Sequence, residues 1–229
     1  MKILRDILTD ECGVVDIERL GSHATDRETA LGTEVSGICS DSRKVTPGCA
    51  FIAVHGAACD GHGFIGKAAG AGAAVIVYDD RTAAEKSLAE AGVFSGDIVL
   101  VQVKSTRHAL GFIASAWFDN PSRRLRLVGI TGTNGKTTTV TLLYRLFTSL
   151  GYSCGLLSTI ANYVAGTRSE TANTTSDPIT INSLLNEMCG CGCEFCFMEV
   201  SSIGLEQERV AGLEFCAGIF SNLTHDHLD

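Results

Sequence analysis

The sequence of 229 residues lacks any apolar run of the roughly 18 residues that a membrane span requires. We also expect no secretory signal, because the start, MKILRDILTDECG, is interrupted by Lys2, Arg5, Asp6, Asp10 and Glu11. Basic residues are few, 18 Lys and Arg against 26 Asp and Glu, which gives a net charge of -8. Since nucleic-acid binding usually needs a basic face, we expect no nucleic-acid partner. Because no apolar run is long enough to span a bilayer, we expect no membrane partner either. We expect a cytoplasmic, monomeric protein.

The sequence also lacks the second pair of closely spaced cysteines that many structural zinc sites have. Four of the ten cysteines cluster at Cys189, Cys191, Cys193 and Cys196, but no further pair lies at a standard zinc-site distance. Cys196 falls inside the apolar run EFCFMEV, which reads as a strand whose alternate side chains face opposite ways. We therefore expect free thiols in a reducing compartment, with a zinc site as the alternative.

The order of apolar runs predicts an α/β protein with two domains, residues 1–103 and 104–229. In the first segment, strands are expected at 49–54, 73–78 and 97–103, separated by Gly-rich turns and by a helix in GFIGKAAGAGA. This segment contains no phosphate loop.

The second segment repeats strand, loop, helix and strand. Helices are expected at 105–118, 137–150 and 179–188, the first capped by Ser105 or Thr106. The runs RLRLVGI, EFCFMEV and CAGIFSN are the expected strands. This pattern predicts a parallel sheet with helices on both faces.

The sequence VGITGTNGKTTT lies where a phosphate loop should lie, after an apolar strand and before a helix. Its glycines let backbone N–H groups point at phosphates, Lys136 adds a positive charge, and the Thr137 hydroxyl can bind Mg²⁺. The strict pattern G-x-x-x-x-G-K-[ST] fails by one position, because its first glycine would fall at Ile130 while the glycine present is Gly129. The alternative is a Gly-rich turn with an incidental lysine.

A nucleotide site of this kind also needs a carboxylate for the metal. Glu199 ends the apolar run CFM, as the acidic residue of a Walker B strand does, and is the best candidate. The cluster NLTHDHLD after the strand CAGIF suggests the rim of an active site. The alternatives are a solvated glutamate and a solvated polar loop.

Four segments in this order, GTNGKTTT, NTTSDP, MEVSSIGLEQERV and FSNLTHDHLD, resemble the central domain of the Mur ligases. Within residues 1–103, the run SDSRKVTPGCAFIAVHGAACDGHGFI resembles the UDP-binding domain of the same family. The motif GTNGKTT alone marks a superfamily that includes folylpolyglutamate synthase, whereas the later motifs are more specific. The resemblance implies an N-terminal UDP-substrate-binding domain followed by the first part of a P-loop-type ATPase domain.

The resemblance also implies an activity. The branch of the family that these motifs resemble adds the third amino acid, meso-diaminopimelate or L-lysine, to UDP-N-acetylmuramoyl-L-Ala-D-Glu in peptidoglycan synthesis. ATP and Mg²⁺ are the implied cofactors, and the reaction is an ATP-dependent amide ligation through an acyl phosphate.

The resemblance implies a role for each residue of this sequence that matches a functional position in the family's motifs. The implied catalytic residues are Lys136, Glu199 and His227, and the implied metal ligands are Thr137, Glu199 and His227. The ATP phosphates would be bound by Gly132, Thr133, Asn134, Gly135, Lys136, Thr137 and Thr138.

The muramoyl-peptide substrate would be bound by Asn173, Thr174, Thr175, Ser201, Gln207 and Arg209. The uridine would lie near Ser40, Ser42, Ala57, Ala58 and Cys59, the last three acting through their backbone.

Three positions depart from the family pattern or stand outside it. Ile203 stands where the family often has histidine, and Ser176 where it often has proline. His55 does not align with the uridine loop, and we interpret it as a surface or turn residue. The resemblance further implies a carbamylated lysine and an amino-acid-binding domain, neither of which this sequence contains. We therefore expect a partial chain that forms no amide bond by itself.

Other readings remain open at this stage. One is another ligase of the superfamily, although the UDP-type first segment argues against a folate enzyme. A second is a non-catalytic module that binds a UDP-sugar and a nucleotide. A third is an unrelated P-loop kinase or GTPase, and the absence of an NKxD motif argues against the GTPase.

Overall fold

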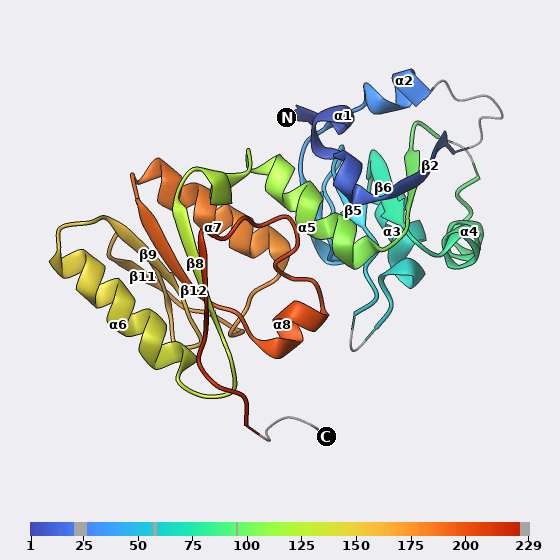
Figure 1. The fold of residues 1–229 in the computed structure, drawn as a ribbon. Helices are drawn as coiled ribbons and strands as arrows, with labels where there is room; N and C mark the ends of the chain where they lie inside the picture. Colours follow the sequence, from blue (N-terminus) through green and yellow to red (C-terminus); the bar gives the residue numbers. More distant parts are fainter. Residues whose placement is uncertain (21–26, 57–58, 95, 225–229) are drawn as a thin grey trace. The chain divides into compact units, whose positions relative to one another are not determined.

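The computed structural model describes residues 1–20, 27–56, 59–94 and 96–224 of the chain (Figure 1). The chain forms two compact units, Met1–Trp117 and Phe118–Asp229, each built around its own sheet. Within the described residues, none of the helices combines the length and the apolar character needed to cross a bilayer.

A five-stranded sheet with the order β2-β7-β6-β5-β4 forms the centre of the first unit. Neighbouring strands are parallel except β2, which runs antiparallel to β7. The strands are β2 (Val14–Arg19), β4 (Ile38–Cys39), β5 (Ala50–Ile52), β6 (Val75–Tyr78) and β7 (Val99–Val103). Every residue of β5 and β6 is buried, as expected for inner parallel strands covered on both faces.

Helices and a small second sheet surround these strands. The helices are α1 (Leu4–Ile7), α2 (Arg27–Leu31), α3 (Ile65–Gly70), α4 (Arg81–Glu90) and α5 (Thr106–Trp117), and the 3₁₀ turns are η1 (Asp10–Cys12), η2 (Ser42–Lys44) and η3 (Gly61–Phe64). The antiparallel pair β1 (Lys2–Ile3) and β3 (Glu34–Val35) forms the small sheet.

Close packing of α3 against α4 depends on a glycine. A Cβ atom at Gly66 would collide with the backbone oxygen of Ser87 and with the Cβ of Ala91, and a backbone oxygen cannot swing aside. We expect Gly66→Ala to lower the free energy of unfolding by about 1–3 kcal/mol, the usual cost of overpacking. Gly70→Ala is the matched control in the same helix, because a Cβ there meets nothing within 4 Å. Equal denaturation midpoints for the two variants would contradict this account.

The second unit contains a six-stranded sheet with the order β11-β10-β9-β12-β8-β13. The strands β9, β12, β8 and β13 are parallel, while β10 and β11 form an antiparallel extension. The strands are β8 (Arg126–Thr131), β9 (Cys154–Leu157), β10 (Asn162–Val164), β11 (Thr167–Ser169), β12 (Phe195–Glu199) and β13 (Ala217–Phe220). The helices are α6 (Lys136–Ser149), α7 (Pro178–Gly190) and α8 (Ser202–Glu206), with the 3₁₀ turn η4 (Pro121–Arg123).

Helices α6 and α7 cover opposite faces of this sheet. Phe197 of β12 packs in the cluster under α6, whereas its neighbours Cys196 and Met198 pack in the cluster under α7. This alternation follows from the two-residue period of a strand. The predicted parallel sheet with helices on both faces is confirmed.

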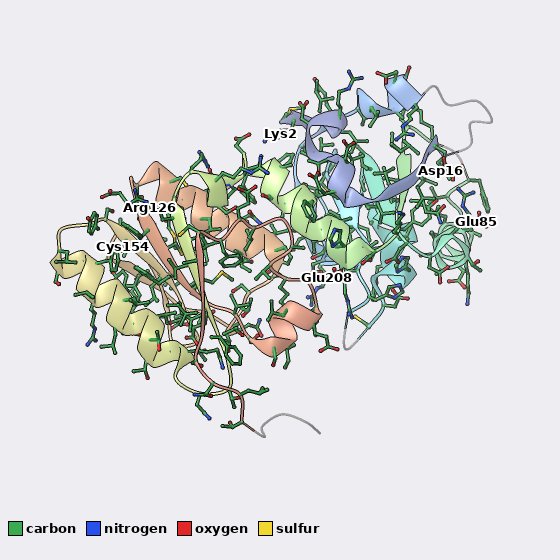
Figure 2. The ribbon with its side chains drawn as sticks, in the orientation of Figure 1. Lys2, Asp16, Glu85, Arg126, Cys154 and Glu208 are labelled. Atoms are coloured by element: carbon green, nitrogen blue, oxygen red, sulfur yellow. The ribbon has the colours of Figure 1, made fainter. Side chains whose placement is uncertain are left out.

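The direction of the parallel strands shows at which edge of the sheet a ligand site is expected. Arg126 and Cys154 both pair with Phe195, so they mark the edge where β8, β12 and β9 begin (Figure 2). The strands therefore end together at the opposite edge, where the phosphate loop begins. Ligands of open parallel sheets bind at that carboxyl edge.

The division between the units differs from the sequence-based boundary after Val103. Helix α5, assigned from the sequence to the second domain, packs on α1 and η1 and belongs to the first compact unit. Its amphipathic face could be read from the sequence, but the partner of that face could not. The helix begins as expected, with the Ser105 hydroxyl accepting from His108 N at 3.2 Å.

Candidate active site

The phosphate loop joins β8 to α6 through two glycines with positive φ. Gly132 has a φ of 125° and Gly135, which precedes the first helical residue, has a φ of 88°. A Cβ at Gly132 would also collide with the Ser221 hydroxyl and the backbone of Asn222. Glycine is therefore required at position 132 for both conformation and space.

The segment after β13 holds the loop through its backbone amides. Thr133 N donates to Asn222 O at 2.9 Å, and Asn134 N donates to Asn222 Oδ1 at 3.0 Å. The Ser221 hydroxyl donates to Asn134 O at 2.8 Å. Amides of this kind bind phosphate oxygens in phosphate loops, so Asn222 occupies donors that a nucleotide would use.

Lys136 begins α6 and folds back over the loop. Its Nζ donates to Gly132 O at 2.7 Å and to Thr133 O at 3.0 Å. The ammonium group is therefore held over the same loop whose amides could bind phosphates. A phosphoryl group in the loop would replace neutral carbonyl partners with charged ones, which form stronger hydrogen bonds.

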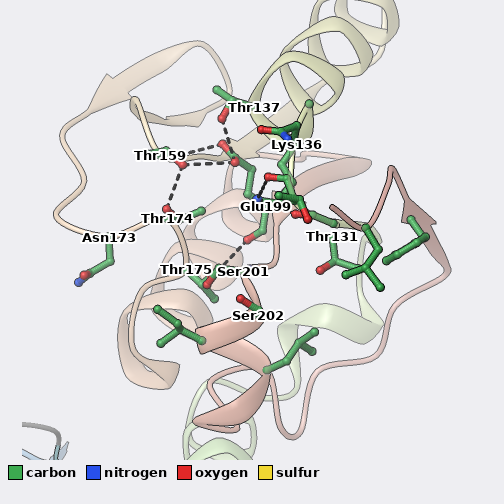
Figure 3. A pocket seen from close by; sticks show the side chains of 18 of the residues that line it. Thr131, Lys136, Thr137, Thr159, Asn173, Thr174, Thr175, Glu199, Ser201 and Ser202 are labelled. Carbon is green, nitrogen blue, oxygen red and sulfur yellow. Dashed lines mark hydrogen bonds between the residues drawn. The ribbon is translucent and has the colours of Figure 1, made fainter. Parts of the chain in front are cut away.

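Glu199 ends β12, the strand next to β8, and is 1% exposed. Its Oε2 accepts from the Thr137 hydroxyl at 2.9 Å, and its Oε1 accepts from Thr159 N at 2.9 Å. The Thr159 hydroxyl lies 3.2 Å from Oε2 and 3.1 Å from Thr174 Oγ1 (Figure 3). Hydroxyl and carboxylate oxygens are the donors that Mg²⁺ prefers, so the pair of Thr137 and Glu199 fits this ion.

A second network joins the segment before α7 to the end of β12. The Thr175 hydroxyl donates to Glu199 O at 3.1 Å, accepts from Ser201 N at 3.0 Å and lies 3.2 Å from Ser201 Oγ. Arg209 Nη1 donates to Thr175 O at 2.6 Å, and its Nε and Nη2 donate to Gln207 Oε1 at 3.1 and 2.7 Å. These bonds fix the predicted substrate loop against the predicted metal ligand.

The two networks face one cavity of about 810 Å³. Of the residues proposed from the sequence, those lining it are Gly132, Thr133, Asn134, Gly135, Lys136, Thr137, Asn173, Thr174, Thr175, Glu199, Ser201 and Arg209. Thr138 is exposed on the first turn of α6, and Gln207 takes part through Arg209. Ile203 also lines the cavity. His227 lies outside the described residues.

Thr159 lines the cavity and bonds Glu199, but it was not among the residues proposed from the sequence. It follows β9, which pairs in parallel with β12, so both strands end at the same edge of the sheet. Ligands of open parallel sheets bind at the carboxyl edge, so this position could have been proposed if β9 had been recognised as a parallel neighbour of β12.

The residues proposed for the uridine lie in the first unit. Ser40 follows β4, and Ser42 begins η2, whose N-cap Asp41 accepts from Arg43 N. The Arg43 side chain also donates to Asp41 and holds the pKa of that carboxyl well below its usual range. Cys59 is exposed, and its backbone oxygen accepts from Gly56 N at 3.1 Å. Ala57 and Ala58 lie outside the described residues.

The four clustered cysteines do not share one environment. Cys196 is fully buried in β12, as predicted, and burial raises the pKa of its thiol well above the ordinary value. Cys193 is buried, whereas Cys191 is exposed. The ligand atoms of a zinc site converge on one ion, whereas these thiols lie in different environments.

Together, these features define a class of protein. A strand, phosphate loop and helix, with a buried carboxylate on the adjacent parallel strand, form a P-loop-type α/β unit, and a separate α/β unit precedes it. Two family comparisons agree: the Mur ligase middle domain matches residues 130–229, and the Mur ligase family catalytic domain matches residues 34–118. The chain belongs to the Mur ligase family.

Individual relatives point to one branch of this family. The chain is 50% identical over 196 residues to a UDP-N-acetylmuramoyl-L-alanyl-D-glutamate--2,6-diaminopimelate ligase of Cytophaga hutchinsonii and 46% identical over 200 residues to one of Parabacteroides distasonis. These matches cover 86% and 87% of this chain and 39% of each relative. A solved structure of a ligase with the same name superposes with a TM-score of 0.70 at 25% identity, covering 90% of this chain and 40% of that one. The chain therefore spans about two fifths of the length of these relatives.

Proposed function

We propose that the protein containing these residues is an ATP-dependent amide ligase that adds meso-diaminopimelate to UDP-N-acetylmuramoyl-L-Ala-D-Glu. The single observation that carries the proposal is the cavity in which Lys136, Thr137 and Glu199 face Thr174, Thr175 and Arg209. The choice of diaminopimelate over lysine rests on the names of the relatives. The first unit, through Ser40, Ser42 and the loop at Cys59, is the proposed uridine site.

The reaction requires a carboxylate to attack the γ-phosphate of ATP, and an amine then displaces phosphate from the acyl phosphate. Little covalent chemistry falls to the protein, so positioning and neutralisation of charge dominate catalysis. Loop amides of Thr133 and Asn134 would bind phosphate oxygens, and Lys136 would follow the transferring group. Arg209 would orient an anionic group of the peptide substrate.

Thr137 and Glu199 are the described residues that would hold Mg²⁺. When bound, the ion supplies positive charge against the phosphates. Glu199 is fixed for this task by its bonds to Thr159 and Thr137, because a buried carboxylate with several donors keeps one orientation.

Calorimetry with the purified chain tests the substrate assignment. We expect UDP-N-acetylmuramoyl-L-Ala-D-Glu to bind more tightly than the corresponding tripeptide, and a non-hydrolysable ATP analogue to bind in the presence of Mg²⁺. Phosphate release by the protein containing these residues should then depend on diaminopimelate and not on lysine. Tight binding of both ligands with no amino-acid-dependent turnover would favour a non-catalytic module instead.

Arg209 provides a sharper test of the substrate side. We expect Arg209→Ala to weaken binding of UDP-N-acetylmuramoyl-L-Ala-D-Glu by about 1–3 kcal/mol, the range for losing a charge-assisted hydrogen bond. Arg168→Ala, which removes an exposed arginine from β11, is the matched control and should leave the dissociation constant unchanged. Thermal melting of both variants separates lost binding from lost folding. An unaltered dissociation constant for Arg209→Ala would assign this residue to holding Thr175 only.

A further inference from the structure

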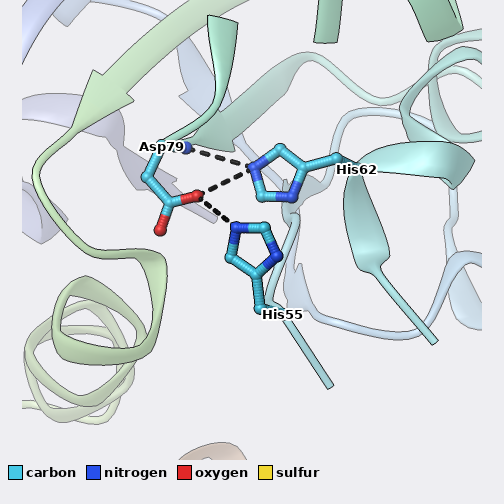
Figure 4. A group of neighbouring side chains, drawn as sticks. All are labelled: His55, His62 and Asp79. Carbon is cyan, nitrogen blue, oxygen red and sulfur yellow. Dashed lines mark hydrogen bonds and ion pairs between the residues drawn. The ribbon is translucent and has the colours of Figure 1, made fainter. Parts of the chain in front are cut away.

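Two histidines and two aspartates meet in the first unit, outside the cavity described above. His55 lies shortly after β5, His62 lies in η3, and Asp79 directly follows β6 (Figure 4). Asp60 pairs with His55 in an isolated bridge and caps η3. The parallel pairing of β5 with β6 brings these segments together.

Both imidazole rings direct their Nε2 atoms at one carboxylate oxygen. Asp79 Oδ1 lies 3.0 Å from His62 Nε2 and 3.1 Å from His55 Nε2, and the rings are stacked with centroids 4.5 Å apart. Ligand atoms of these three residues all lie within 4.8 Å of one another. Tetrahedral coordination at bond lengths of about 2.0–2.2 Å separates ligand atoms by about 3.3 Å, so one ion can reach all three with small movements.

The opposite ends of the rings are held by Asp60. Its Oδ1 lies 2.7 Å from His62 Nδ1 and 3.2 Å from His55 Nδ1. An Nδ1–H donated to a carboxylate leaves the Nε2 lone pair for a metal, which is the usual arrangement of metal-binding histidines. The Nε2 atoms of both rings and the anionic oxygen of Asp79 then lie close together.

Asp79 is similarly oriented by its other oxygen. Asp79 Oδ2 accepts from Thr106 N at 2.8 Å and from the Thr106 hydroxyl at 3.0 Å, at the start of α5. These bonds leave Oδ1 toward the histidines. The amides of Asp79 and Asp80 donate to His62 Nε2 at 3.2 and 3.3 Å, so a metal at this atom requires the ring to turn away from both N–H groups.

We propose that His55, His62 and Asp79 bind a divalent transition-metal ion of the Zn²⁺ type, with water completing the coordination. The set of two imidazoles and one carboxylate suits zinc, whereas Mg²⁺ prefers oxygen donors alone. His62 is fully buried and Asp79 largely so, while the His55 side chain is 46% exposed, which gives the ion and a water a path from solvent. The ion would tie the segment after β5, which leads to Cys59, to the ends of β6 and η3.

Cobalt(II) titration of the purified, reduced chain tests the site, because Co²⁺ occupies zinc sites and reports its ligands by absorption. We expect one site with d–d bands and without the intense near-ultraviolet bands of thiolate ligands. His55→Ala should weaken this binding at least about 10- to 100-fold, the range already seen when residues supporting a metal ligand are lost. Asp79→Asn should weaken it too, while keeping the shape of the side chain.

His108→Ala is the matched control, since it removes a histidine of α5 outside the cluster, and its affinity should equal that of the unchanged protein. Melting curves recorded without metal establish that the variants fold. The proposal is overturned by the absence of Co²⁺ binding to the folded protein, by equal affinity in His55→Ala, or by a spectrum dominated by thiolate bands. The last result would place the ion at the cysteine cluster.

Discussion

Lys136→Ala is expected to lower the affinity for ATP by about 10- to 100-fold and to leave the affinity for UDP-N-acetylmuramoyl-L-Ala-D-Glu nearly unchanged. A hydrogen bond to a charged group contributes about 1.5–3 kcal/mol, which corresponds to this range. The loss of binding free energy stays below the full energy of the Lys136–phosphate hydrogen bond. Without a nucleotide, Lys136 already has Gly132 O and Thr133 O as partners. Calorimetry with each ligand measures the two affinities.

Arg145→Ala is the matched control for this substitution. It removes one positive charge from an exposed position of the same helix, away from the loop. If general electrostatic attraction rather than the loop geometry held the nucleotide, both variants would lose similar affinity. Loss of uridine-substrate binding in a folded Lys136→Ala protein would refute the assignment of Lys136 to the nucleotide and of the uridine to the first unit.

Glu199→Gln is expected to reduce the Mg²⁺ dependence of nucleotide binding, with at least about a 10-fold loss of apparent Mg²⁺ affinity. The amide has nearly the same shape, and its oxygen can still accept from Thr159 N. Its NH₂ group can donate to the hydroxyls of Thr137 and Thr159, because hydroxyl groups rotate to accept. The substitution therefore removes charge while keeping the network, and the melting temperature should change little.

Titrating Mg²⁺ at a fixed concentration of ATP analogue measures this effect. Glu206→Gln removes an exposed carboxylate from the nearby α8 and should leave the titration unchanged. An unchanged Mg²⁺ titration for Glu199→Gln would mean that the carboxylate supports the loop without holding the ion.

The elements that could be predicted from the sequence are those determined locally. β8, the phosphate loop and α6 follow from an apolar run, two glycines and a Lys-Thr pair that are contiguous in the chain. Glu199 could be proposed because it ends an apolar run, as the acidic residue of a Walker B strand does. The parallel sheet itself followed from the alternation of strands and helices.

Other features depend on which segments become neighbours. Thr159 reaches Glu199 only because β9 is inserted beside β12, and strand order is not written in either segment. Helix α5 has an apolar face that both units could have covered. His55 was interpreted as a surface or turn residue, and it is exposed, yet its environment comes from His62 and Asp79 on segments that the chain reaches later.

The hydrogen-bond chain from Thr137 through Glu199 and Thr159 to Thr174 has a thermodynamic consequence for the proposed ligands. The proposed metal ligand Glu199 and the proposed peptide loop share these bonds. An ion at Glu199 that draws the carboxylate away from Thr159 therefore changes the hydroxyl available to Thr174. Coupling between two binding equilibria is reciprocal. Whatever factor Mg²⁺ and ATP impose on the dissociation constant of the peptide substrate, the peptide substrate imposes the same factor on theirs, and the order of addition leaves the final occupancy unchanged.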